Sequence, residues 1–151
     1  MSLRTPQRAY APMPHDTYYT PTRHVAPLID YARDIGLFDA APEIWECAAG
    51  AGHLALGLQD AGFRVFASDL HPPPVRRQLV PVVPMDFLSS SGLSGRRFSV
   101  VTNPPYGQQS RLIIAFLTHA FHLLRSHMGG IAMLLPFEFD ARMSRSELAG
   151  E

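Results

Sequence analysis

The residues best suited to chemistry are Asn103, Pro104, Pro105 and Tyr106, which follow a run of β-forming residues that begins at Phe98. Each proline fixes its own φ angle near about −65° and restrains the residue before it, so the loop has little conformational entropy left to lose. The side-chain oxygen of Asn103 and the carbonyl oxygen of Pro104 are two acceptors that suit a planar NH2 group. Tyr106 could stack on a planar substrate, a contact worth roughly 1–3 kcal/mol for a nucleobase.

A glycine-rich loop precedes this site in the chain. Residues 43–48 predict a short apolar strand, Gly50 and Gly52 predict a tight turn, and residues 54–61 have the apolar spacing of a helix. Asp69 follows a second predicted strand at the distance expected of an acid that bonds a ribose, so a nicotinamide-dinucleotide domain is one interpretation. Glu46 favours another, because its carboxylate would repel a pyrophosphate, whereas a zwitterionic cofactor with an ammonium group tolerates it.

The elements that position both loops are strands alternating with helices. Further strands are predicted at 79–83, at a sheet edge because of Pro81, from Phe98 onwards, and at 131–135. A helix that includes residues 25–32 comes before the glycine loop. This alternation predicts an α/β fold with a Rossmann-like, doubly wound, mainly parallel sheet of about five strands in the order 3-2-1-4-5, in three α/β/α layers, with ligands at the carboxyl ends of the strands.

One long helix is predicted between the last two strands, capped by Ser110 and ending near Gly129. Its spacing assigns Leu112 and Phe116 to the buried side, and Phe121 is also interpreted as core packing, as are Phe137 and Phe139 further on. Residues 1–15 are expected to be a mobile tail, residues 16–140 a single domain, and 141–151 a C-terminal segment.

Composition excludes several classes of function. The sequence has 46% hydrophobic residues, no apolar run of about 18 residues and no signal-peptide pattern, so a cytoplasmic protein without a membrane span is expected. Cys47 is the sole cysteine, which excludes an internal disulfide, and neither it nor His119 and His122 forms a ligand set for a metal. The net charge is zero, which argues against strong autonomous binding to duplex DNA.

Three segments together resemble the class I S-adenosylmethionine-dependent amino-methyltransferases, in particular the adenine-N6 DNA methyltransferases. The segments are DTYYTP at 16–21, ECAAGAGHL at 46–54 and NPPY at 103–106. The family's usual loop has a proline and a further acid where this chain has Cys47 and Ala51. The resemblance implies a cofactor site and a catalytic loop. The implied cofactor residues are Tyr19, Thr20, Glu46, Ala48, Gly50, Gly52, Asp69, Leu70, Asp86, Phe87 and Asn103, and the implied catalytic residues are Asn103, Pro104, Pro105 and Tyr106.

What the resemblance implies is methyl transfer from S-adenosylmethionine to an exocyclic amino nitrogen, with adenine N6 in DNA as the expected acceptor and no metal. Duplex DNA would have to be base-flipped to reach the site. The resembled fold normally adds an antiparallel strand pair after the fifth strand, for which we find no candidate. Either a homodimer or a separate recognition subunit is expected to cover that edge, or the chain is a shortened or degenerate relative. The alternatives are a glutamine-N5 protein methyltransferase, a nicotinamide-dinucleotide domain and an inactive cofactor-binding remnant.

Overall fold

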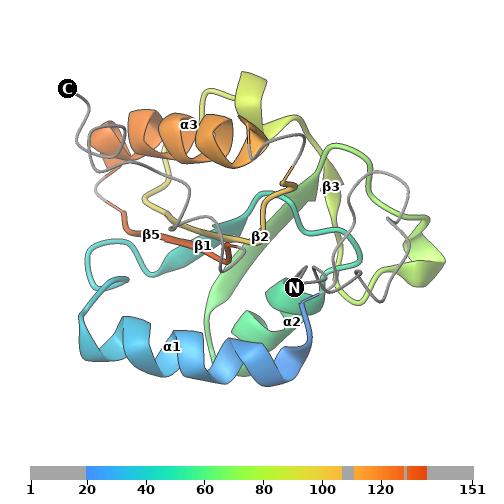
Figure 1. Ribbon diagram of the computed structural model, residues 1–151, viewed down its shortest axis with the longest axis horizontal. Helices are drawn as coiled ribbons and strands as arrows, with labels where there is room; N and C mark the ends of the chain where they lie inside the picture. Colours follow the sequence, from blue (N-terminus) through green and yellow to red (C-terminus); the bar gives the residue numbers. More distant parts are fainter. Residues whose placement is uncertain (1–19, 107–110, 128, 136–151) are drawn as a thin grey trace, which may run out of the picture.

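A computed structural model describes residues 20–106, 111–127 and 129–135 of the chain (Figure 1). The predicted tail at 1–15 and the C-terminal segment at 141–151 lie outside the described residues. The same holds for four residues with sequence-based assignments, which are Tyr19, Ser110, Phe137 and Phe139.

Five parallel strands form one sheet in the order β3-β2-β1-β4-β5, which confirms the predicted fold class and strand order. The strands are β1 (Glu43–Glu46), β2 (Arg64–Asp69), β3 (Val83–Pro84), β4 (Ser99–Thr102) and β5 (Ile131–Met133). Strand β4 ends one residue before Asn103, as the two prolines dictate, because Pro104 and Pro105 cannot donate to a strand ladder. The carboxyl ends of β1, β2 and β4 therefore lie side by side in the middle of the sheet.

Helices cover both faces of the sheet. Figure 1 shows α1 (Val25–Asp34) and α2 (His53–Asp60) on one face and α3 (Arg111–His127) on the other. Short 3-10 turns lie at η2 (Thr22–His24), η3 (Val75–Arg77) and η4 (Phe87–Ser89). Across the part of the chain that the structure describes, none of the helices is both long and apolar enough to cross a membrane.

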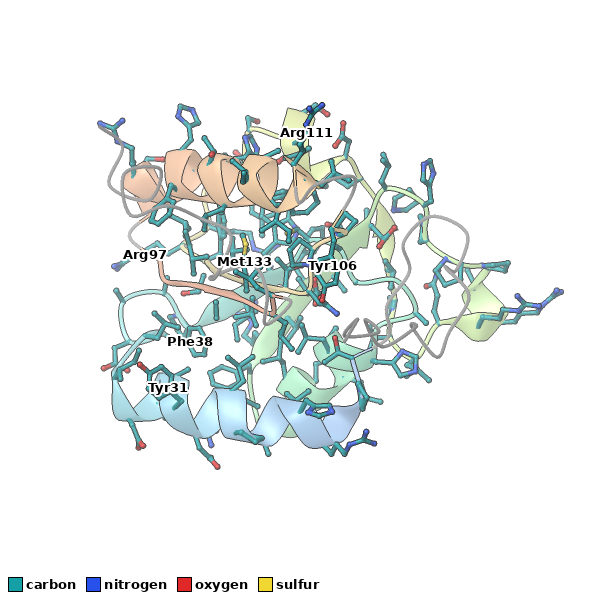
Figure 2. All side chains as sticks on the ribbon, in the orientation of Figure 1. Tyr31, Phe38, Arg97, Tyr106, Arg111 and Met133 are labelled. Atoms are coloured by element: carbon teal, nitrogen blue, oxygen red, sulfur yellow. The ribbon has the colours of Figure 1, made fainter. Side chains whose placement is uncertain are left out.

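Successive strand residues pack on opposite faces of the sheet, because side chains alternate between its faces. Ile44 and Phe38 pack on the side of α1 and α2, whereas Trp45 packs on the side of α3. The Trp45 ring lies 5.1 Å from the ring of Phe87 and 5.4 Å from that of Phe98, centroid to centroid. Figure 2 shows Phe38 between α1 and the sheet. Aromatic packing thus fixes the sheet against both helical layers.

The predicted third strand at 79–83 was wrong in its extent, although β3 does lie at the sheet edge. Leu79 N donates to Ala51 O at 2.8 Å, and Val80 packs against Gly52. A Cβ atom on Gly52 would lie 2.6 Å from Val80 Cγ2, and the Gly52 φ of +92° also favours glycine. The segment before Val83 is therefore bonded to the glycine loop and not to a strand.

Two predictions for α3 were also wrong. Leu112 is 37% exposed and Phe121 is 59% exposed, whereas Phe116 is buried as predicted. The helix buries a stripe that includes Ile113 and Ala120, and the residue next to each of these points about 100° away from that stripe. Apolar type alone therefore misassigned Leu112 and Phe121 to the core.

Candidate functional site

A cavity of about 640 Å³ opens at the carboxyl ends of β1, β2 and β4, the edge where parallel α/β sheets bind ligands. Its wall joins residues from both loops that the sequence singled out. The predicted site residues that line it are Thr20, Glu46, Ala48, Gly50, Asp69, Leu70, Asp86, Phe87, Asn103 and Pro105. One cavity thus brings together the glycine loop and the asparagine-proline loop, which are about 50 residues apart in the sequence.

Glu46 ends β1 as a buried carboxyl group, with only 1% of its surface exposed. Its Oε1 accepts hydrogen bonds from Thr102 Oγ1 at 2.5 Å and from Ala48 N at 3.0 Å. Burial raises the pKa of Glu46 to about 7; the negative charge of Asp69 adds to the rise, and the two hydrogen bonds oppose it. An acid that titrates near neutrality therefore stands in the cavity wall between the two loops.

Asp69 ends β2, and its carboxylate accepts hydrogen bonds from the glycine loop and from the backbone that follows β2. Oδ2 accepts from Gly50 N at 2.8 Å, and Oδ1 accepts from His71 N at 2.8 Å. Each carboxylate oxygen can accept a further hydrogen bond, so these contacts leave acceptor capacity for a ligand. The sequence suggested a ribose contact for Asp69, and the structure adds a role in holding the glycine loop to β2.

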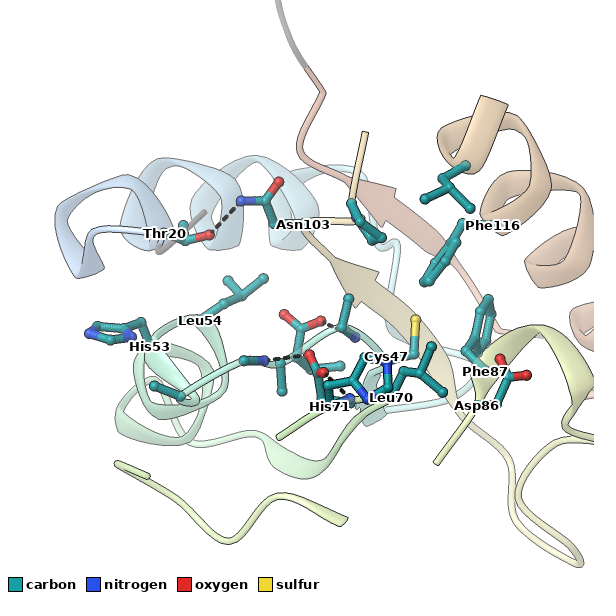
Figure 3. A pocket seen from close by; sticks show the side chains of 18 of the residues that line it. Thr20, Cys47, His53, Leu54, Leu70, His71, Asp86, Phe87, Asn103 and Phe116 are labelled. Atoms are coloured by element: carbon teal, nitrogen blue, oxygen red, sulfur yellow. Dashed lines mark hydrogen bonds between the residues drawn. The ribbon is translucent and has the colours of Figure 1, made fainter. Parts of the chain in front are cut away.

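Asn103 follows β4 and lies between two hydroxyl groups. Its Nδ2 donates to Thr20 Oγ1 at 3.1 Å, and Tyr106 OH donates to Asn103 Oδ1 at 3.4 Å. Thr20 is buried, and it reaches Asn103 across 83 residues of sequence. Figure 3 shows the Thr20 and Asn103 side chains pointing toward each other at the edge of the cavity.

The far side of the cavity is apolar. Phe87 is buried, and its ring lies 5.1 Å from that of Phe116, while Leu70 lines the same cavity with half of its surface exposed. Asp86 Oδ1 accepts from Leu88 N at 3.0 Å and caps η4, which fixes the carboxylate at this end (Figure 3). An apolar wall flanked by a fixed acceptor suits a planar ring that carries an amino group.

Three predicted site residues are not part of the cavity wall. Gly52 packs beneath the loop against Val80, and Pro104 is fully buried. Tyr106 contacts the cavity through its hydroxyl bond to Asn103. Gly52 and Pro104 thus lie behind the wall, and Tyr19 lies outside the described residues.

The structure also adds wall residues that the sequence did not indicate. His71, Pro73, Leu112 and Phe116 line the cavity, as does Cys47. Burial and the neighbouring Glu46 raise the pKa of the Cys47 thiol, so it stays protonated. The available signal for Leu112 and Phe116 was their i, i+4 spacing at the start of α3, which sequence reasoning assigned only to packing.

His53 begins α2 and lines the cavity directly after the glycine loop. His119 and His122 lie on α3 with their rings 6.5 Å apart, and His119 Nε2 contacts the backbone oxygen of Ser90 at 3.1 Å. Among residues 20–106, 111–127 and 129–135, no three histidine, cysteine or acidic side chains come together as a metal site.

No family model matches the chain, and a search of curated proteins finds no match.

Proposed function

We propose that this protein is an S-adenosylmethionine-dependent methyltransferase that acts on an exocyclic amino nitrogen. The observation that carries the proposal is the shared cavity, in which Glu46, Asp69 and Asn103 stand at the ends of three neighbouring strands. Acidic groups that suit a cofactor with an ammonium and a ribose thereby face the same space as an amide that suits an acceptor amine.

The cavity fits such a cofactor in size and in chemistry. Its volume of about 640 Å³ lies within the range of small-molecule sites. Glu46 is a buried acid that an ammonium group would stabilise in its charged form, and Asp69 retains acceptor capacity for ribose hydroxyls. Phe87 offers an apolar surface for an adenine ring, beside the fixed carboxylate of Asp86.

The glycine loop fits a pyrophosphate less well. Ala48 N donates to Glu46, and Gly50 N donates to Asp69, so two amides of the loop already bond carboxylates. A dinucleotide would bring its phosphates toward two acidic side chains, which repel them. These contacts favour a methyl donor over a nicotinamide dinucleotide.

Held by Glu46, Asp69 and Phe87, S-adenosylmethionine would supply a methyl group, and the electron pair of the bond from that group to sulfur would stay on sulfur. The chain's own contribution is position and electrostatics. Asn103, which lines the cavity, accepts a hydrogen bond from the acceptor amine through Oδ1, and this bond favours the positive charge that develops on nitrogen as the C–N bond forms. Tyr106 stacks on the acceptor base, and a proton of the methylated nitrogen leaves to solvent.

Adenine N6 in DNA is the proposed acceptor, and one assay compares it with the alternatives. The protein is incubated with S-adenosylmethionine labelled in its methyl group, with single-stranded DNA, duplex DNA, RNA and protein as acceptors. Label in N6-methyladenine is the expected result. Label on a protein glutamine would show that glutamine, and not adenine, is the acceptor. Binding of S-adenosylmethionine without transfer would indicate an inactive cofactor-binding remnant. Binding of a nicotinamide dinucleotide without binding of the methyl donor would overturn the proposal.

Replacing Asp69 by alanine is expected to raise the dissociation constant for S-adenosylmethionine by about tenfold or more. The change removes the ribose acceptor and also removes the 2.8 Å hydrogen bonds that Gly50 N and His71 N donate to it. A tenfold change in the dissociation constant corresponds to about 1.4 kcal/mol. Calorimetric titration measures the constant. Asp60→Ala, at the exposed end of α2, is the matched control. An unchanged constant in Asp69→Ala would remove Asp69 from the cofactor site.

A further inference from the structure

The side chain of Asn103 is oriented by a residue from a distant part of the chain. Thr20 Oγ1 accepts from Asn103 Nδ2 at 3.1 Å, while the contact from Tyr106 OH to Asn103 Oδ1 is longer, at 3.4 Å. Thr20 is 6% exposed, so water does not readily replace its bond to Asn103 (Figure 3). The shorter contact, to the buried hydroxyl of Thr20, therefore restrains the amide.

The orientation matters because the two ends of an amide are chemically opposite. Oδ1 accepts hydrogen bonds and Nδ2 donates them, so a half-turn of the amide would point two N–H donors at the N–H donors of an acceptor amine. With Nδ2 bonded to Thr20, Oδ1 is the end that an amine can use, and an incoming N–H can share or replace the long contact from Tyr106.

The backbone around both partners is well anchored. Next to Asn103, Thr102 Oγ1 donates to Glu46, which ties the end of β4 to β1. Next to Thr20, Pro21 O accepts from His24 N at 2.9 Å and begins the turn into α1. Val25 of α1 is 2% exposed and packs so closely on Gly57 of α2 that a Cβ there would lie 2.9 Å from Val25 Cγ2. The neighbouring segments thus hold the hydroxyl of Thr20 in place.

We propose that Thr20 is a positioning residue for methyl transfer: its buried hydroxyl accepts a hydrogen bond from Asn103 Nδ2 and keeps Oδ1 available to the acceptor amine. This role differs from the cofactor contact that the resemblance implied for Thr20, and it rests on the proposed function. It assigns to the N-terminal segment a part in the chemical step rather than in cofactor affinity.

The test compares Thr20→Val, which removes the hydroxyl at similar volume, with Thr20→Ser, which keeps it. Thr20→Val is expected to lower kcat about tenfold and to leave the dissociation constant for S-adenosylmethionine within about twofold. Thr20→Ser should recover most of kcat. Thr118→Val, on the exposed side of α3, is the matched control and should change neither quantity.

A second readout does not depend on activity. Asn103 is the only asparagine of the chain, so labelling with ¹⁵N-asparagine gives a single side-chain amide pair in the NMR spectrum. In Thr20→Val this pair should shift and its hydrogens should exchange faster with water, whereas Thr20→Ser should preserve both properties.

The outcomes separate the two proposals. An unchanged amide signal in Thr20→Val overturns the positioning role, and so does an unchanged kcat. A raised dissociation constant for the methyl donor at constant kcat would make Thr20 a cofactor contact. If the wild-type protein transfers no methyl group while the amide signal still depends on Thr20, the contact stands and the proposed function fails.

Discussion

Replacing Asn103 by alanine is expected to lower methyl transfer by about 10²–10³-fold while the affinity for S-adenosylmethionine changes by less than about threefold. The substitution removes the Oδ1 acceptor that stabilises the positive charge on the reacting nitrogen. It leaves the bonds of Glu46 and Asp69 in place, because neither carboxyl group contacts the Asn103 side chain in the contacts described. Single-turnover rates at saturating methyl donor, combined with calorimetric titration, measure the two quantities separately.

The control for Asn103→Ala is a measurement of whether the variant is folded. Trp45 is the only tryptophan and is fully buried, so its fluorescence reports whether the variant keeps its core. A folded variant that loses transfer alone supports a role in the chemical step. An equal loss of transfer and of donor binding would instead make Asn103 a cofactor residue, and full activity would remove the loop from the reaction.

The elements that shape the site could be predicted because their signals are local. The β-forming run before Asn103, the two prolines after it and the glycines after Glu46 each restrict the backbone within a few residues. The alternation of strands with helices then predicts a parallel sheet in the order 3-2-1-4-5, and the ends of its strands meet at one edge. That is how residues from both loops came to line the same cavity.

The features that were missed depend on contacts between distant segments. The pairing of Thr20 with Asn103 spans 83 residues and leaves no periodic signal. Leu79 bonds Ala51 of the glycine loop, which shortened the third strand, although its apolar neighbours have strand character. Phe121 is apolar, as core residues are, but its position around the axis of α3 leaves it exposed. Residue type alone does not contain these tertiary constraints.

Replacing Glu46 by glutamine is expected to make the protein more stable and to weaken its binding of the methyl donor. Because burial raises the folded-state pKa from 4.5 to about 7, the folded state binds a proton that the unfolded state has already lost between these values. The contribution of Glu46 to the stability of the wild-type protein is therefore fully present below about pH 4.5 and is lost as pH rises through about 7. The rise in the pKa of Glu46 corresponds to a loss of about 3 kcal/mol in the free energy of unfolding at pH 8, as an order of magnitude.

Glutamine resembles the protonated acid and does not ionise, so Glu46→Gln should not lose this stability. Urea unfolding followed by Trp45 fluorescence at pH 5.5 and at pH 8 measures the difference between the two proteins. The difference between the two proteins isolates the contribution of Glu46. The stability of the variant relative to the wild type should increase as pH rises. A variant that is less stable than the wild type at pH 8 would contradict the conclusion that burial of the ionised Glu46 destabilises the protein.

Binding should respond to pH in the opposite direction. An ammonium group beside Glu46 stabilises its ionised form, so donor binding lowers the pKa of Glu46 and releases a proton, and affinity rises as pH passes through about 7. Glu46→Gln should remove this pH dependence and weaken binding at pH 8 by about 10–100-fold, or roughly 1.4–2.7 kcal/mol. Titration calorimetry in two buffers of different ionisation enthalpy measures the proton released. Equal affinity in the two proteins at pH 8, with no proton released by the wild type, would show that the acid does not face the cation, and the cost of burying Glu46 would then have no counterpart in ligand binding.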